Sequence, residues 1–252
     1  FSELVDYTYP WPKYSQVVVR DFVSGAIENS TGVIFGDFVQ KHKEELITSP
    51  NDDIVAHEMF HHWFGDLVTT ENWANLVLNE GFANYSEYLW REHKYGVDHA
   101  ESHRYNQLKG YLNQAASQRH SLVRYDYTNE MQMFDAHSYN KGGLVLHMIR
   151  NYIGDDAFFT SLNKYLVDNE YTAVEVDELR MAFEDVTGKD MHWFFNQWFH
   201  ASGHPDLKID HTYNAETNTV TLEVIQRQDP ENNEAIYQLP TQVEIFYGED
   251  DS

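Results

Sequence analysis

HEMFHHWFGD, residues 57–66, contains three histidines and one glutamate within its first six positions. If this stretch is helical, His57 and His61 are four residues apart and lie on the same face, so both imidazoles can reach one ion. His62 is turned by about 100° from His61 and cannot join them. Glu58 is too close to His57 in the chain to be a comfortable ligand, but its carboxylate can lean over the open side of the ion. The spacing therefore predicts a helix that holds a metal ion.

A histidine pair alone also fits an ordinary charged helix face, so a third ligand has to decide between the two interpretations. HExxH is a motif of zinc-dependent hydrolases, in which zinc keeps three protein ligands and leaves its fourth position to water. The stretch NEGFANYSE supplies Glu80, nineteen residues after His61. A second helix packed against the first would bring its carboxylate to the metal. Glu87 lies on nearly the same face and is a candidate to orient a ligand imidazole, although an ordinary surface glutamate fits as well.

The composition limits the kinds of partner. The chain has 252 residues, a hydrophobic content of 42% and a formal net charge of −24, so it can bury a core. Its negative field disfavours nucleic acid and membrane surfaces as partners, and it fits either a cationic ligand or a solvated acidic surface. There is no cysteine, so any metal must use histidine and carboxylate ligands. No apolar run approaches the roughly 20 residues of a membrane span, which predicts a soluble chain, and the compartment stays unknown because the chain begins without methionine.

Two parts of the sequence have the patterns of strands. Residues 16–37 are rich in valine, isoleucine and phenylalanine with glycine breaks, which predicts two strands joined by a turn near 29–32. After SGHPDL, polar and apolar residues alternate around a turn at 214–218, and YQLPTQVEIFYG continues the alternation. Three strands are predicted there, and they resemble the opening of a β-sandwich. The sequence therefore predicts a first domain over residues 1–205 and a partial sandwich over residues 206–252.

The region between these strands has the periodicity of helices. The helix that carries HEMFH is predicted over residues 50–65. Ser49 would cap it, Pro50 fits its first position, and Asp52 completes a capping box. Further helices are predicted over 74–94, where Gly96 marks the end, and over 98–118, 139–153, 155–168, 175–187 and 189–201.

Taken together, these motifs resemble the aminopeptidase N family of gluzincin metallopeptidases. The pattern of that family is HExxH, eighteen residues and then Glu in the context NEGFA. Here HEMFH is followed by HWFGDLVTTENWANLVLN and then EGFA. Two further signatures match, because GAMEN stands here as GAIEN, residues 25–29, and the Tyr-x-Lys-Gly segment stands as YNKGG, residues 139–143. The resemblance covers about residues 10–205, with the motifs in the expected order.

The resemblance implies an α+β fold: a mainly helical, thermolysin-like catalytic domain with a small β-sheet, followed by the start of a β-sandwich. In the family this domain follows an N-terminal β-saddle domain, and a β-sandwich and a helical domain come after it. The chain is therefore expected to be a fragment of a larger enzyme. It would lack the saddle domain, the first strands of the catalytic domain and the C-terminal domains.

The resemblance also implies a zinc-dependent mechanism for cleaving peptides. His57, His61 and Glu80 are predicted to hold one Zn²⁺ per chain, with Glu58 as the general base that takes a proton from the attacking water. The resemblance assigns Tyr139 as the donor that stabilises charge on the peptide oxygen. Without the YNKGG context it would be only one of 17 tyrosines. The predicted enzyme is a zinc metallo-aminopeptidase, which makes it a hydrolase and a metalloprotease.

The segment GAIEN favours an aminopeptidase, which must recognise the free α-ammonium group of its substrate. By resemblance Glu28 binds that amine, and the small residues Gly25 and Ala26 let an edge strand approach the substrate backbone. Ile27 replaces the methionine of the family and is expected to reshape the pocket for the first side chain, and Asn29 ends the substrate-binding segment. The predicted substrates are peptides with a free N-terminus. Because the family's second amine-binding group belongs to the saddle domain, the isolated chain is expected to be weak or inactive.

Three alternatives remain open. A leukotriene-hydrolase-like enzyme would combine epoxide hydrolysis with aminopeptidase activity on the same scaffold. A catalytically inactive, zinc-containing binding module would need neither Glu58 nor Tyr139 and would be closed by a fourth protein ligand. A thermolysin-like endopeptidase is disfavoured by GAIEN.

The remaining histidines show no ligand-like spacing to a carboxylate and are expected to be ordinary surface or core residues. They are His42, His93, His99, His103, His120, His137, His147, His192, His200, His204 and His211.

Overall fold

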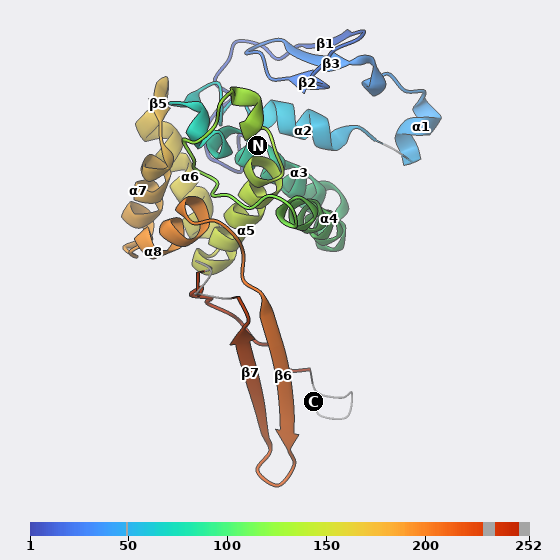
Figure 1. The fold of residues 1–252 in the computed structure, drawn as a ribbon. Helices are drawn as coiled ribbons and strands as arrows, with labels where there is room; N and C mark the ends of the chain where they lie inside the picture. The colour runs from blue at the N-terminus through green and yellow to red at the C-terminus, as the bar shows by residue number, and fades with distance from the viewer. Residues whose placement is uncertain (49, 229–234, 247–252) are drawn as a thin grey trace. The chain divides into compact units, whose positions relative to one another are not determined.

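The computed structural model describes residues 1–48, 50–228 and 235–246. The chain divides into two compact units, Phe1–Ser202 and Gly203–Ser252, so the second unit begins three residues before the predicted domain boundary. The first unit is mainly helical with two small sheets (Figure 1), which confirms the predicted α+β class. Among the described residues, no helix has both the length and the apolar character needed to cross a membrane.

A three-stranded sheet forms the N-terminal part of the first unit. The sequence predicted two strands here, and the structure has three, because residues 20–25 interrupt the extended chain with turns in which Asp21 and Gly25 have positive φ. The predicted turn is confirmed by a hydrogen bond of 2.9 Å from the Gly32 N–H to the Asn29 carbonyl. β1 runs parallel and β2 antiparallel to β3, in the order β1-β3-β2. The strands are β1 (Gln16–Val19), β2 (Ala26–Ile27) and β3 (Val33–Gly36).

The helix that carries HEMFH, α2 (Asp52–Phe60), is shorter than predicted. It follows two short helices, η1 (Asp37–Val39) and α1 (Lys43–Thr48), and it lies alongside the N-terminal sheet in Figure 1. Asn51 is the N-cap and makes no capping hydrogen bond with its side chain. Asp52, which was expected to complete a capping box, instead forms an ion pair with Lys94. The predicted cap, Ser49, lies outside the described residues.

The chain leaves α2 through hydrogen-bonded turns. The helix ends at Phe60, where the sequence predicted five more helical residues, and the N–H groups of Trp63 and Phe64 donate to the carbonyl of Phe60. Gly65 follows with φ +143°, and a Cβ at this position would lie 3.1 Å from the carbonyl oxygen of His61. Strand β4 (Val68–Thr70) begins three residues later. His61 is the C-cap of α2, and its ring lies 4.9 Å from that of His57.

The central helix of the first unit is α3 (Val77–Tyr95), which ends at Gly96 as predicted, with φ +91°. It follows η2 (Trp73–Asn75) and packs against α2, α4 (Val97–Ala115) and α5 (Gly142–Ile153). The approach to α5 is backbone to backbone, because a Cβ at Gly142 would lie 2.9 Å from the Cα of Gly81. This contact lies one residue after Glu80 and directly after the π-helical turn η4 (His137–Lys141), which carries Tyr139.

The remaining elements complete the core of the first unit. Predicted helices 155–168 and 175–187 are confirmed, whereas predicted helix 189–201 is divided into a short helix and a π-helical turn. A parallel pair of strands, β4 and β5, was not predicted, because three residues in each are too few to show alternation. The rings of Phe64 and Phe82 stack at 4.1 Å in the core. The elements are η3 (Glu130–Met133), α6 (Asp155–Asn169), β5 (Thr172–Val174), α7 (Val176–Thr187), α8 (His192–Phe195) and η5 (Asn196–His200).

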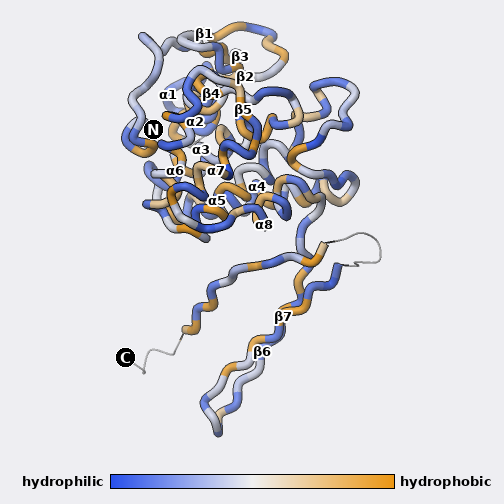
Figure 2. The backbone as a smooth tube through the Cα atoms, turned by 90° about the vertical axis from the view of Figure 1, so that its left-hand side faces the viewer, coloured by the Kyte–Doolittle hydropathy of each residue, from blue (hydrophilic) through white to orange (hydrophobic). Residues whose placement is uncertain are grey.

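In the second unit, the described residues form an antiparallel hairpin of β6 (Leu207–Asn214) and β7 (Thr219–Gln226). The predicted turn ends at Asn218, which has φ +52°. Most side chains of both strands are exposed, and Figure 2 shows hydrophilic and hydrophobic stretches alternating along them. The third predicted strand is absent from described residues 235–246. The assignment of this unit to a β-sandwich stays a prediction.

Candidate active site

His57 and His61 meet Glu80 at the contact between α2 and α3. The Nε2 atoms of the two histidines lie 3.3 and 3.4 Å from the same oxygen, Glu80 Oε2. The imidazole rings are 4.9 Å apart with an interplanar angle of 75°, so they diverge instead of stacking. Ligand atoms that share a tetrahedral zinc ion at bond lengths of about 2.0–2.2 Å are about 3.4 Å apart. The three buried side chains therefore fit a single metal ion.

The far sides of both imidazoles face hydrogen-bond acceptors. His57 Nδ1 lies 2.9 Å from Glu87 Oε1, and His61 Nδ1 lies 3.2 Å from the carbonyl oxygen of Phe64. These acceptors favour the tautomer with its proton on Nδ1, which leaves the Nε2 lone pair free to face a metal. Glu87 therefore lies where the sequence analysis expected an orienting carboxylate.

Glu87 is itself held by α4. His103 Nε2 lies 3.2 Å from Glu87 Oε2, and the amide of Gln107 donates to the same oxygen at 3.4 Å. Gln107 also accepts from Asn140 Nδ2 through its backbone carbonyl at 3.2 Å, which connects this group to the residue after Tyr139. The sequence analysis missed His103 and Gln107. They lie one turn apart on α4, and their contact with Glu87 depends on how α4 packs against α3.

The charges around the two imidazoles create a negative potential. Burial alone would lower the pKa of His57, but the hydrogen bonds and charges of Glu80 and Glu87 outweigh it and raise the pKa to about 10. Burial alone would raise the pKa of Glu80, but the charge of His61 and hydrogen bonds to both histidines lower it. A site whose carboxylates stabilise positive charge this strongly is suited to a divalent cation.

Glu58 lies beside the candidate ligands. Its carboxylate belongs to a group with Glu28 and His61 whose ligand atoms all lie within 4.8 Å of one another. Burial raises the pKa of Glu58 to about 7, and the charges of His57 and His61 oppose this shift. A carboxyl group with a pKa near neutrality can accept a proton and give it back.

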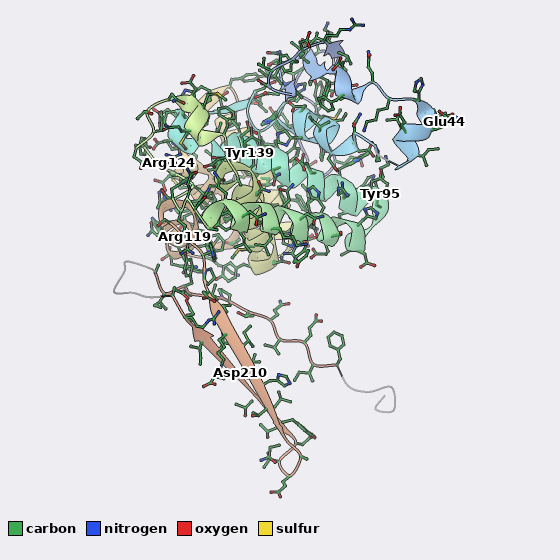
Figure 3. All side chains as sticks on the ribbon, turned by 45° about the vertical axis from the view of Figure 1, so that its right-hand side comes forward. Glu44, Tyr95, Arg119, Arg124, Tyr139 and Asp210 are labelled. Carbon is green, nitrogen blue, oxygen red and sulfur yellow. The ribbon has the colours of Figure 1, made fainter. Side chains whose placement is uncertain are left out.

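Tyr139 lies across the site from α2, in the π-helical turn η4 (labelled in Figure 3). Its ring is parallel to that of His57, with the centroids 5.9 Å apart and an interplanar angle of 11°. Burial raises the pKa of its phenol, and the charge of Glu80 raises it further. The phenol is therefore a neutral hydrogen-bond donor over the whole range in which proteins are stable.

The GAIEN segment forms the edge of the N-terminal sheet nearest to α2. Gly25 makes the left-handed bend before β2, and Ala26 and Ile27 are the two residues of that strand. Because β2 is an edge strand, one of its sides is open to pairing with an extended peptide. Glu28 follows directly and reaches the carboxylate of Glu58 through the group described above. Asn29 does not belong to that group, and its carbonyl closes the turn to β3.

Other histidines that the sequence analysis set aside also meet carboxylates. His120 Nε2 lies 2.7 Å from Asp135 Oδ2, and His137 Nδ1 lies 3.6 Å from the same oxygen. The sequence analysis expected ordinary surface or core roles for both histidines and did not identify Asp135 as their shared neighbour. The sequence contains no signal for this cluster, because His120 and Asp135 are 15 residues apart in a segment with little regular structure. His62 is buried and its Nδ1 lies 2.6 Å from the hydroxyl of Tyr9.

The sequence was compared with protein families and with curated proteins. The family model of the peptidase family M1 domain matches residues 1–198. Aminopeptidase M1-A of Oryza sativa subsp. japonica is 31% identical over 216 residues, which are 83% of this chain and 25% of that protein. Aminopeptidase N of Streptomyces lividans is 31% identical over 222 residues, which are 83% of this chain and 26% of that protein. The chain spans about a quarter of the length of these relatives.

A comparison with solved structures gives the same fold. The crystal structure of Legionella pneumophila aminopeptidase A in complex with aspartic acid aligns with a TM-score of 0.74 and 24% sequence identity. The alignment covers 90% of this chain and 26% of that chain. At this identity the likeness establishes the fold alone.

Proposed function

The chain belongs to the peptidase M1 family of metallopeptidases, and from that premise we propose that it is the catalytic part of a zinc-dependent aminopeptidase. The proposed reaction is removal of the N-terminal residue from a peptide. The observation that carries the proposal is that His57 and His61 direct their Nε2 atoms to one oxygen of Glu80, at 3.3 and 3.4 Å.

His57, His61 and Glu80 are the residues that would hold the zinc ion. When bound, it would supply Lewis acidity to a water molecule and to the peptide carbonyl. The ligand set also accepts cobalt or manganese, but two imidazoles and one carboxylate without sulfur are typical of a hydrolytic zinc. The hydrogen bonds from the two Nδ1 atoms support this role, because they fix the orientation of both rings before any metal arrives.

Glu58 is proposed to move the proton. It would take a proton from the water that attacks the peptide carbonyl and then deliver it to the departing amine. Support for this role comes from its position beside His61 and from burial, which raises the pKa of its carboxyl to about 7. Such a group exchanges protons in both directions near neutral pH.

Tyr139 is proposed to stabilise the negative charge that develops on the carbonyl oxygen. Its phenol interacts with the carboxylate of Glu80, one of the candidate ligands, and its ring lies parallel to that of His57. Because burial raises its pKa, the phenol keeps its proton and can donate a hydrogen bond throughout the reaction.

Glu28 is proposed to bind the free α-ammonium group of the substrate. It is the first residue after the edge strand β2, and its carboxylate lies close to that of Glu58. A peptide that pairs with the free edge of β2 would therefore present its N-terminus to Glu28 and its first carbonyl to the metal site. Ile27, which is 36% exposed, is proposed to contact the first side chain of the substrate.

The test uses Glu58→Gln in the longest natural polypeptide that carries this sequence, with a panel of aminoacyl p-nitroanilides as substrates. We expect the variant to keep its metal and to lose kcat by about 10²–10⁴-fold, because general acid–base catalysis contributes that much. Glu44→Gln removes the same charge from the exposed helix α1 (Figure 3) and is the matched control, with unchanged turnover expected. Near-normal turnover by Glu58→Gln would exclude this residue as the base.

A second measurement separates an aminopeptidase from an endopeptidase. Peptides with a free N-terminus should be cleaved, whereas the same peptides with an acetylated N-terminus should be resistant, because acetylation removes the charge that Glu28 is proposed to bind. Equal cleavage of both forms would overturn the aminopeptidase assignment and leave the peptidase chemistry in place.

A further inference from the structure

The π-helical turn η4 places Tyr139 in the site, and it is a conformation that needs support. Single π-helical turns are rare, and they occur mostly where a functional side chain has to be directed. Here the turn joins residues 116–136, a segment whose only described helix or strand is the short η3, to α5. The end of η4 is fixed by the close contact of Gly142 with α3, and its start needs a separate anchor.

Asp135 supplies that anchor. Its Oδ1 accepts hydrogen bonds from the backbone N–H groups of His137 at 2.9 Å and Ser138 at 3.1 Å. Its backbone carbonyl accepts from the N–H of Tyr139 at 3.1 Å. One residue therefore binds three successive N–H groups at the start of the turn, which would otherwise be without acceptors.

His120 in turn fixes the carboxylate of Asp135. Its Nε2 lies 2.7 Å from Asp135 Oδ2, and its Nδ1 lies 2.9 Å from the carbonyl oxygen of Ser121. Because the two ring nitrogens face oxygens on opposite sides, the imidazole is held between Ser121 and the carboxylate, and the carboxylate is held in turn by the ring. Hydrogen bonds from His120 and from the backbone N–H of Ser138 lower the pKa of Asp135 against the effect of burial, which keeps it ionised.

Ring packing holds His120 in this orientation. The ring of His137 stacks on it at 3.8 Å with an interplanar angle of 28°. The ring of His137 also makes an edge contact with the ring of Tyr111 from α4, with the centroids 5.3 Å apart and an interplanar angle of 90°. His137 is 1% exposed. The segment before η4 is thus clamped between α4 and the turn that it supports.

We propose that Asp135, held by His120, is a positioning residue that sets the location of the Tyr139 phenol in the catalytic site. The inference rests on the proposed function, because the phenol needs an accurate position only if it donates to a reacting oxygen. Asp135 itself does not contact the substrate in this proposal. It acts through the backbone of η4.

The expected kinetic signature follows from this indirect role. The hydrogen bond from Tyr139 is proposed to form as charge develops on the carbonyl oxygen, so a displaced phenol should lower kcat and leave KM nearly unchanged. Removing a donor of this kind costs about 10²–10³-fold in kcat. Displacing it should cost less, about 10–100-fold.

The test compares Asp135→Ala with the wild type in the longest natural polypeptide that carries this sequence. We expect kcat on an aminoacyl p-nitroanilide to fall by about 10–100-fold, with KM within about threefold and one equivalent of zinc still bound. Asp126→Ala is the matched control in the same segment, because Asp126 is exposed and pairs only with Arg124 among the described residues. It should retain full activity. Figure 3 labels Arg119 and Arg124, which belong to this segment, and Tyr139; all three lie in the first compact unit.

A double variant separates positioning from general destabilisation. If Asp135 acts through Tyr139, then adding Asp135→Ala to Tyr139→Phe should lower kcat by less than about twofold further. An equal loss in both backgrounds, an unchanged kcat in the single variant, or loss of zinc would overturn the inference. Asp135→Asn keeps an oxygen for the two N–H groups and loses the charge opposite His120. It gives an intermediate effect and serves as the second variant if the alanine variant does not fold.

A spectroscopic measurement tests the position of the ring without using activity. 3-Fluorotyrosine at position 139 should give a ¹⁹F resonance that shifts or splits in Asp135→Ala and stays unchanged in Asp126→Ala. An unchanged spectrum in both variants would overturn the inference, whether or not the wild type cleaves peptides. Failure of the wild type on every substrate would instead contradict the proposed function, so the two failures are distinguishable.

Discussion

Two clusters in the first unit each contain two histidines and one carboxylate, and their geometries differ. In the cluster of His57, His61 and Glu80, the rings are 4.9 Å apart at 75°, and both nitrogens lie 3.3–3.4 Å from the shared oxygen. In the other cluster, the rings of His120 and His137 stack at 3.8 Å and 28°. There, one nitrogen lies 2.7 Å from an oxygen of Asp135.

The difference teaches that donor type alone does not make a metal site. Imidazoles on one tetrahedral ion point their nitrogens at a common centre and spread apart, which the first pair does. Stacked rings direct their nitrogens side by side, and a nitrogen and an oxygen at 2.7 Å already share a proton. In the first cluster the donor atoms lie at the separation expected of ligands around one ion, whereas in the second a nitrogen and an oxygen lie at the distance of a short hydrogen bond.

The two clusters also differ in the hydrogen-bond partners that orient their imidazole rings. Both histidines of the first cluster use Nδ1 for an outside acceptor and keep Nε2 for the centre. Both ring nitrogens of His120 lie at hydrogen-bond distance from an oxygen, so neither is kept for a common centre. Burial lowers the pKa of His137, which keeps that ring neutral and suited to packing.

The largest expected effect tests whether the first cluster binds a metal ion and the second does not. His61→Ala should remove the metal and lower kcat/KM by about 10³-fold or more, because Lewis acidity and the ordered water are lost together. His137→Ala removes a histidine from the second cluster and should leave one equivalent of metal per chain. Metal content by elemental analysis after dialysis and kcat/KM are the measurements. Two equivalents in the wild type, or loss of metal from His137→Ala, would show that the second cluster also binds an ion.

A smaller effect sharpens the role of the orienting partner in the first cluster. Glu87→Gln keeps the shape of the side chain and weakens its hydrogen bond with His57, so metal affinity should fall by about 10–100-fold. Competition with a chromophoric chelator measures the affinity. Glu101→Gln is the control. Glu101 pairs with Arg104, and this variant should bind metal as the wild type does. An unchanged affinity for Glu87→Gln would assign that residue to packing.

The last expected effect concerns stability and belongs to the second cluster. The lowered pKa of Asp135 means that its ionised form stabilises the folded state above the unfolded pKa of about 3.9. This contribution is lost as the pH falls through the lowered folded pKa. Asp135→Asn should therefore reduce the free energy of unfolding by about 1.5–3 kcal/mol at pH 7.

Urea denaturation at pH 7, 5 and 3 measures that difference. The gap between the wild type and Asp135→Asn should be nearly the same at pH 7 and 5 and smaller at pH 3. A gap that stays constant over this range would mean that the carboxylate is not the stabilising group.

The sequence predicted those features that depend on spacing along one helix. His57 and His61 four residues apart, and the end of α3 at Gly96, are local properties of the chain. The approach of Glu80 also followed, because two consecutive elements usually lie side by side. The structure brings the three candidate ligands together, and their role in binding zinc stays a prediction.

Features that depend on packing between distant elements could not be predicted. The contact of His103 with Glu87 joins the helices α4 and α3, and the contact of His120 with Asp135 joins two ends of a segment with little regular structure. The helical pattern does not reveal that α2 ends at Phe60 and is followed by turns up to Gly65. Strands of three residues, such as β4, are shorter than any periodicity that a sequence can display.

The close contact of Gly142 with Gly81 fixes the positions of α3 and α5 relative to each other. Glu80, a proposed metal ligand, lies on α3 beside Gly81. Tyr139, the proposed phenolic donor, lies in η4, which ends directly before Gly142. If the contact between Gly142 and Gly81 opened during heating, Glu80 and Tyr139 would lose their positions relative to each other in one step. Inactivation would then be all-or-none, because no partly assembled site could persist with one of the two groups still aligned.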